Sequence, residues 1–127
     1  RNKLYSMDRN TQKKQMSALG AAPEWALGSV HAVTENGSLL IASNTGSQLS
    51  AYTYSASNVI FVIGTQKLVK NLETGFERIY TYTLPLEDER SKKAYGVGSN
   101  VSKMLIINKE INPQRIHIFL VKDKLGF

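Results

Sequence analysis

The sequence contains no cysteine among its 127 residues. This absence excludes disulfides, thiolate nucleophiles, cysteine-ligated metals and cysteine-bound iron–sulfur clusters from the chain, and it leaves the identity of any other cofactor open. A chain without cysteine suits a reducing compartment, so we expect a cytoplasmic protein.

Long apolar runs are also missing. The two longest, residues 59–63 and Ile116–Val121, have the length of strands and fall far short of the roughly 20 residues that span a bilayer. We therefore expect a soluble protein with no membrane contact. No apolar segment of the signal-peptide type precedes Ala18 and the chain has no initiator Met, which predicts a fragment or a processed chain.

Positive charge is in excess, with 16 Lys and Arg against 10 Asp and Glu and a formal net charge of +6. Such an excess raises the question of a nucleic acid or a small anionic ligand. The basic residues come in scattered pairs, such as Lys13-Lys14 and Lys92-Lys93, and form no stripe interleaved with exposed aromatics. We therefore expect solvated helix faces and chain ends, and no nucleic-acid partner.

The first half of the chain predicts a surface helix and a hairpin. Residues 7–21 carry helix formers with few strong apolar positions, Asp8 can cap their N-terminus, and Pro23 ends the helix. Residues 29–43 hold two strand-like runs around Asn36-Gly37, which predicts a β-hairpin because both residues tolerate positive φ. A polar loop at residues 44–47 and a short helical turn within residues 48–55 should follow.

A buried strand and two helices are expected next. Residues 58–63 form an apolar run without alternation, which predicts a central parallel strand covered on both faces. Thr65 is a plausible cap for a helix beyond this strand. That helix is indicated by apolar residues at helical spacing, namely Leu68, Val69, Leu72, Phe76 and Ile79. A second helical stretch should run from near Pro85 through Ala94.

The C-terminal third predicts a loop and two strands. Residues 96–100 form a glycine-rich loop, and residues 104–108 and 115–121 read as strands joined at Asn112-Pro113. Because this connection is too short for a crossover helix, we expect the two strands to pair as an antiparallel hairpin. Residues 1–127 are thus expected to form a single α/β domain with a mixed sheet and β-hairpins.

Several segments in the same order resemble a known family. They are residues 34–39, 59–64, 67–69, 98–110, Arg115 and 125–127. Together they are similar to the LUD (lactate-utilisation) domain family over roughly residues 10–127, with the closest likeness to its uncharacterised branch. The resemblance implies a Rossmann-like, mainly parallel sheet flanked by helices, similar to CoA transferases, ribose-5-phosphate isomerase and glucosamine-6-phosphate deaminase.

The same resemblance bears on function. It implies a part in organic-acid metabolism of the lactate type, together with iron–sulfur proteins as partners, which would have to carry the clusters that this chain cannot. It also implies that family members possess an N-terminal helical segment that this chain lacks. The chemistry of the family is not established, so the resemblance leaves open whether the chain is an enzyme.

Glu35 is a candidate nucleophile. Residues 34–37 are similar to the Ser-Glu-Asn-Gly turn that carries the nucleophilic glutamate of many CoA transferases. Such a carboxylate attacks an acyl-CoA thioester to give an anhydride and then a glutamyl thioester, while backbone N–H groups, here of residues 96–98, stabilise the oxyanion. This requires Glu35 and the loop of residues 96–100 to lie within about 10 Å of each other. The alternative is a polar residue beside a turn whose Asn36 and Gly37 serve turn geometry.

Polar loops beside the expected strands are candidate ligand-binding segments. Loops at the carboxyl ends of strands in open α/β sheets commonly bind ligands, and clustered N–H groups, hydroxyls and a lysine suit a phosphate or carboxylate. The alternative is ordinary turn and capping chemistry. The candidate ligand-binding residues are Asn36 and Gly37 in the hairpin turn, Asn44, Gly46 and Ser47 in the next loop, and Gly98, Ser99, Asn100 and Lys103 in the last loop.

The two histidines give a weaker signal. His117 is expected to be a half-buried strand residue, whereas His31 alternates with Val33 and Glu35 and could share a face with Glu35. Two histidines without an acidic pattern predict no metal site, and no phosphate-binding or dinucleotide motif is present. We therefore expect an accessory domain that binds a small anionic metabolite. The alternatives are an enzyme of the CoA-transferase type acting on a CoA thioester, and a homo-oligomerisation module.

Overall fold

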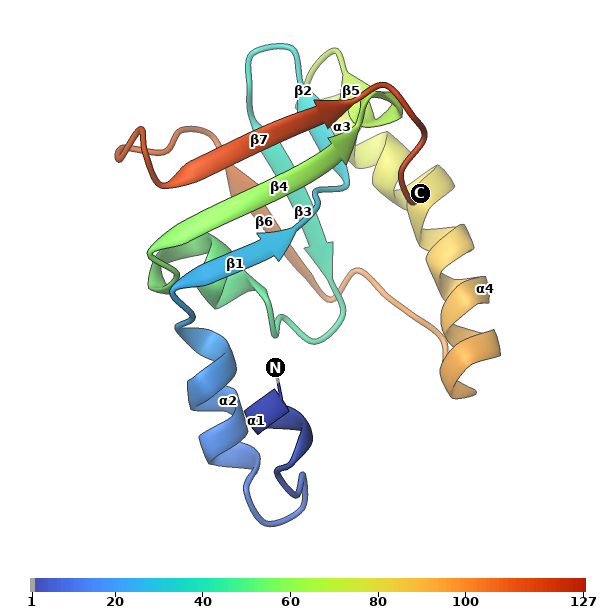
Figure 1. The fold of residues 1–127 in the computed structure, drawn as a ribbon. Coiled ribbons are helices and arrows are strands. Elements are labelled where there is room, and N and C mark those ends of the chain that lie inside the picture. The colour runs from blue at the N-terminus through green and yellow to red at the C-terminus, as the bar shows by residue number, and fades with distance from the viewer. Residues whose placement is uncertain (1) are drawn as a thin grey trace.

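The computed structural model describes residues 2–127 as two small β-sheets and a helical column (Figure 1). Sheet A is entirely parallel, with strand order β1-β4-β7, and sheet B is mixed, with strand order β5-β2-β3-β6. The strands are β1 (Trp25–Gly28), β2 (Ala32–Thr34), β3 (Leu39–Ser43), β4 (Asn58–Gly64), β5 (Leu68–Val69), β6 (Lys103–Ile107) and β7 (Ile116–Val121). The α/β class predicted from the sequence is confirmed, and the arrangement is consistent with a Rossmann-like fold.

The main core lies between the two sheets. β4 is the central strand of sheet A, as predicted, and its residues Val59, Phe61 and Ile63 are fully buried against sheet B. Its other face is only partly covered, which corrects the expectation of a strand buried on both sides. In the described chain no helix lies over that face, where Trp25 is 55% exposed and Phe119 is 56% exposed.

The predicted hairpin around Asn36-Gly37 is confirmed as β2 and β3. Gly37 has a φ of 91°, a conformation that glycine adopts without steric cost. The alternation of β3 divides its side chains between two layers, because Leu39 and Ile41 face sheet A whereas Leu40 packs in the second core against the helices. Sheet B is therefore the middle layer of the molecule.

The helical column comprises α3 (Leu72–Arg78), a π-helical turn (Ile79–Thr83) and α4 (Leu84–Tyr95). The expectation for α4 is confirmed. The widened turn before it is explained by Pro85, which has no N–H to donate to the preceding turn. A further π-helical turn at Ala51–Ser55 confirms the helical turn expected within residues 48–55.

The cap predicted for the first of these helices is wrong. Asn71 caps α3, and its side chain accepts a hydrogen bond from the Thr74 N–H at 2.9 Å. Thr65 instead begins a 3₁₀ turn (Thr65–Lys67), and the next two residues form β5. Leu68 pairs in parallel with Val33, although the spacing of the apolar residues predicted a helix here. This pairing supplies hydrogen-bond partners for the backbone groups at that edge of β2.

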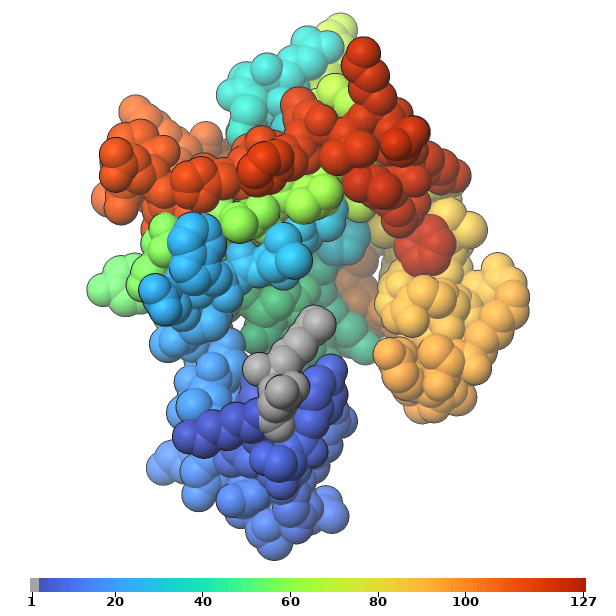
Figure 2. Space-filling model, viewed as in Figure 1, coloured from blue at the N-terminus to red at the C-terminus, as the bar shows by residue number. Residues whose placement is uncertain are grey.

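The N-terminal helices project away from the two sheets (Figures 1 and 2). The expected helix over residues 7–21 is shorter than predicted: it begins at Lys13 as α2 (Lys13–Ala21) and ends before Pro23 as predicted, and a separate short helix, α1 (Asn2–Tyr5), precedes it. Asp8 is not its cap, because its carboxylate is engaged by the Asn10 N–H and the Thr11 hydroxyl. None of the helices between residues 2 and 127 combines the length and apolar character that a membrane span requires.

The last two strands do not form the expected hairpin. β6 pairs antiparallel with β3 in sheet B, whereas β7 pairs parallel with β4 in sheet A. The loop of residues 108–115 therefore carries the chain from one sheet to the other. β1 was not expected from the sequence, yet it pairs with β4 on the side opposite β7 and completes sheet A.

Arg115 holds this crossing in place. Its guanidinium is buried and donates to the carbonyl oxygens of Ala56 at 3.0 Å, Ala51 at 2.9 Å and Tyr52 at 3.0 Å. A further N–H donates to Glu110 at 2.6 Å. One side chain thus satisfies carbonyl groups of the π-helical turn Ala51–Ser55 at the point where the chain enters β7.

Replacing Arg115 with Met should lower the free energy of unfolding by about 3 kcal/mol, because three carbonyl groups and Glu110 lose a buried, charged donor. Urea denaturation at neutral pH measures this change. Lys93→Met is the matched control, since the Lys93–Glu89 ion pair is exposed and should contribute little. Equal midpoints for the two variants would refute the role assigned to Arg115.

Candidate functional site

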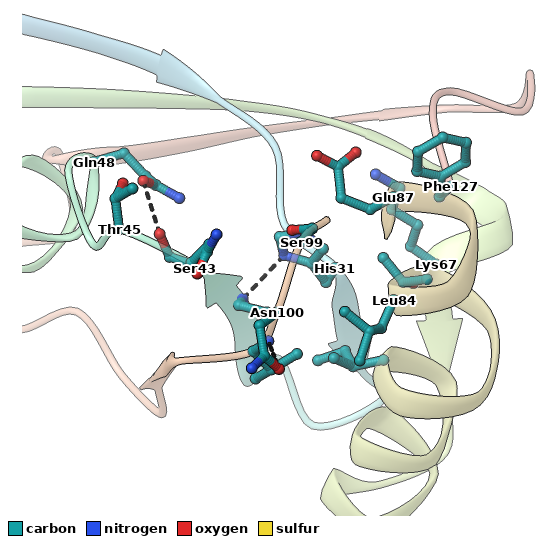
Figure 3. A pocket seen from close by; sticks show the side chains of 15 residues that line it. His31, Ser43, Thr45, Gln48, Lys67, Leu84, Glu87, Ser99, Asn100 and Phe127 are labelled. Carbon is teal, nitrogen blue, oxygen red and sulfur yellow. Dashed lines mark hydrogen bonds between the residues drawn. The ribbon is translucent and has the colours of Figure 1, made fainter. Parts of the chain in front are cut away.

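A cavity of about 300 Å³ lies between one end of sheet B and the helical column. In Figure 2 the hollow opens beside the yellow-to-orange column, and Figure 3 shows the side chains around it. Its lining is mainly polar on the sheet side and partly apolar on the helical side. The lining residues are His31, Ala42, Ser43, Asn44, Thr45, Gln48, Lys67, Ile79, Thr83, Leu84, Glu87, Ser99, Asn100, Val101 and Phe127.

Two of the predicted binding loops meet at this cavity. β3 and β6 run antiparallel, and Ser43 at the end of one pairs with Lys103 at the start of the other. The loop after β3 and the loop before β6 therefore lie side by side, and the Ser102 hydroxyl donates to the Asn44 side-chain oxygen at 3.0 Å. Of the expected ligand-binding residues, the lining includes Asn44, Ser99 and Asn100. Gly46, Ser47, Gly98 and Lys103 belong to the same loops but lie outside the lining.

The hairpin turn lies at the other end of sheet B. Glu35, Asn36 and Gly37 are exposed there, and the Glu35 N–H donates to the Val69 carbonyl at 3.0 Å. The length of β3, about 13 Å for its five residues, separates this turn from the loop of residues 96–100. The structure thus does not bring Glu35 together with its expected oxyanion loop, and the geometry required for the transferase hypothesis is not formed by the described residues.

Lys67 is the most unusual side chain of the cavity. It is only 6% exposed, and its Nζ donates to the Ser29 hydroxyl at 3.3 Å. Within residues 2–127 no carboxylate lies at ion-pair distance from Nζ. Burial lowers the pKa of Lys67, and the nearby Arg78 lowers it further. Sequence reasoning missed this residue, although its place just beyond the central strand was an available signal.

His31 presents a neutral imidazole to the cavity. Its Nδ1 accepts the Ala42 N–H at 3.0 Å, so the proton of the neutral ring is on Nε2. Burial lowers its pKa to about 4, and the positive charges of Lys67 and Arg78 act in the same direction. His31 was expected to share a strand face with Glu35. The structure places it instead in the lining of the cavity together with Lys67.

Three side-chain amides line the sheet side of the cavity, and each uses its carbonyl oxygen within the chain. Asn44 accepts from Ser102, Gln48 accepts from Ser43 at 3.1 Å, and Asn100 accepts from the Val101 N–H at 2.9 Å. No acceptor within residues 2–127 engages the three NH₂ groups. Because the oxygens are occupied, these amides offer the cavity hydrogen-bond donors.

Glu87 contributes the carboxylate of the lining. It projects from α4 into the hollow, toward the side occupied by Gln48 and Ser43 (Figure 3). Both of its oxygens accept from Arg90 at 2.7 Å, and these hydrogen bonds lower the pKa of Glu87. Arg78 is not part of the lining, but it donates to the hydroxyl of Thr83, which is, at 2.7 Å. The negative charge of Glu87 is thus compensated locally, and the charge of Lys67 is not.

His117 lies far from this arrangement, on the outer face of sheet A. It is exposed, contrary to the expectation of a half-buried residue, because no helix of the described chain covers that face. Its ring stacks on Trp25 with 6.4 Å between the centroids. Residues 2–127 contain no cluster of three histidine or acidic side chains placed to bind a metal ion.

The family comparison agrees with the resemblance noted in the sequence. A model of the LUD domain matches residues 2–121, a segment that contains every strand of both sheets and all of the cavity lining except Phe127. Neither the curated proteins nor the solved structures gave a match. Since the matched segment spans nearly the whole chain, the protein belongs to the LUD domain family.

Proposed function

We propose that the cavity binds a small organic anion through Lys67, and that the domain acts as an accessory binding module in organic-acid metabolism of the lactate type. The observation that carries this proposal is the buried ammonium group of Lys67, which has no carboxylate partner among residues 2–127. A buried charge without a partner costs free energy, and a bound carboxylate would supply the missing partner.

Other residues of the lining suit the oxygens of such a ligand. His31 offers an Nε2–H, and the amides of Asn44, Gln48 and Asn100 offer N–H groups. Hydrogen bonds to a carboxylate are roughly twice as strong as those between neutral groups. A site rich in donors, with Lys67 in its lining and Arg78 nearby, neither of them ion-paired within residues 2–127, therefore favours an anion over a cation or an apolar molecule.

The metabolic role rests on membership of the LUD domain family. Because the chain has no cysteine, any iron–sulfur cluster in such a pathway would be carried by a partner protein. No observation favours the CoA-transferase alternative, since Glu35 is exposed at the opposite end of sheet B from the cavity.

The Lys67→Met variant tests whether Lys67 binds the ligand. A thermal-shift panel of lactate, succinate, hexanoate and gluconate should include at least one acid that stabilises the wild type, by about 2.7 kcal/mol at a concentration of one hundred times its Kd. The variant should lose this shift. Its melting temperature without ligand should be equal or higher, because an apolar side chain replaces an unpaired buried charge.

Lys70→Met provides the control, because Lys70 is exposed and lies outside the cavity. This variant should keep the ligand-induced shift. Retention of the full shift by Lys67→Met, or the absence of any shift in the wild type, would contradict the proposed function.

The free energy of unfolding should depend on pH through His31. The folded-state pKa of His31 is about 4, below its ordinary value of 6.5, so the unfolded chain binds an additional proton between these values. His31 should therefore contribute stability that is fully present above pH 6.5 and is lost as the pH falls toward 4, amounting to about 2–3 kcal/mol.

The measurement is urea denaturation of the wild type and His31→Asn at several values between pH 4 and 7. The difference in unfolding free energy between the two proteins should change with pH, because Asn retains an acceptor for the Ala42 N–H but does not titrate. His117→Asn is the matched control and should follow the wild type, since His117 is exposed. A difference independent of pH would show that His31 is protonated alike in both states.

A further inference from the structure

The size of the cavity limits its ligand. Its volume of about 300 Å³ equals that of about ten water molecules at their liquid density. A hydroxy acid of three carbons, such as lactate, would fill only about a third of this space. The remaining volume would hold water against a polar wall, so a longer ligand makes more contacts with the lining.

The polar groups are divided between two sides of the cavity. In Figure 3, Lys67 and Phe127 lie on one side, Gln48, Thr45 and Ser43 lie on the other, and His31 stands between them. Among residues 2–127, no Lys or Arg side chain belongs to the lining on the side opposite Lys67. It offers instead amide N–H groups and hydroxyls, which are neutral and suit neutral oxygens.

The charges favour a ligand with a single negative group. Among residues 2–127, Lys67 is the one Lys or Arg side chain of the lining, and Glu87 places a carboxylate in the same space. A second ligand carboxylate opposite Lys67 would lose water among neutral donors without gaining a cation as partner. A hydroxyl group fits there better, because it can accept from an amide and donate to the Glu87 carboxylate.

We infer that the ligand is a polyhydroxylated monocarboxylate of about four to six carbons, of the sugar-acid type. Its carboxylate pairs with Lys67, and its hydroxyl groups extend toward Glu87, Gln48 and Asn100. This inference rests on the proposed function, from which it takes the pairing of a carboxylate with Lys67. It replaces the three-carbon acids suggested by the family name with a longer class of the same chemistry.

Calorimetric titration of the full chain with four acids tests the inference. D-Gluconate carries both features, hexanoate has the length without hydroxyls, adipate has a second carboxylate, and lactate is short. Gluconate should bind at least about tenfold more tightly than each of the others, since each neutral hydrogen bond to a hydroxyl contributes a factor of about two to ten.

A matched pair of variants locates the hydroxyl contacts. Asn100→Leu should weaken gluconate about fivefold and should not weaken hexanoate, because it removes one amide donor from the lining and adds apolar surface. Asn112→Leu is the control, since the Asn112 side chain is exposed, lies outside the cavity and likewise accepts a backbone N–H, that of Gln114. It should bind both acids as the wild type does.

The outcomes distinguish a wrong ligand class from a wrong proposed function. Hexanoate, adipate or lactate binding as tightly as gluconate in a Lys67-dependent manner would overturn the inference and leave the proposed function intact. Equal gluconate affinity of Asn100→Leu and Asn112→Leu would also overturn it. If none of the four acids binds, or if Lys67→Met binds them like the wild type, the inference and the proposed function both fail.

Discussion

The pairing of β3 with β6 is the constraint on which the site depends. Its register sets Ser43 against Lys103, so the loop that follows one strand and the loop that precedes the other must emerge at the same end of sheet B. Pairing of β2 with β3 then places His31 beside that end, where Ala42 fixes its tautomer. A slip of one residue would turn Leu39 and Ile41 away from the main core, so the packing of the sheets protects the register of the site.

The packing of β4 in the main core explains why the buried cation Lys67 is tolerated. Three side chains of β4 are fully buried, and Lys67 is the last residue of the short 3₁₀ turn that follows this strand. The position of its backbone is thus set by the core, while its ammonium group extends into the cavity, where no carboxylate of residues 2–127 lies at ion-pair distance. In an arrangement of this kind the hydrophobic free energy of the core offsets the cost of an unpaired charge, which is a common feature of binding sites.

Sequence reasoning identified the elements more reliably than their pairing. The Asn36-Gly37 hairpin, β4 and α4 were predicted because their signals are local: a turn dipeptide, an apolar run, and a proline followed by helix formers. The sheet assignment of β6 and β7 was wrong, because which strand pairs with which is decided by packing between segments far apart in the chain. For the same reason the site was predicted only in part. Asn44, Ser99 and Asn100 were found as loop residues, whereas Lys67 became visible only through its burial.

The C-terminal tail shows how a close backbone contact shapes the cavity. A side chain at Gly64 would lie 2.8 Å from the Asp123 carbonyl and 2.7 Å from the Leu125 nitrogen, so the tail can pack against the end of β4 only because this residue is glycine. Gln66 then holds the tail by donating to the Leu125 carbonyl at 2.9 Å. These contacts bring Phe127 into the lining of the cavity, on the same side as Lys67. Because an apolar ring beside a charged group lowers the local dielectric, the ammonium group of Lys67 would attract an anion more strongly there than at an open surface, and the packing of a single glycine supports this arrangement.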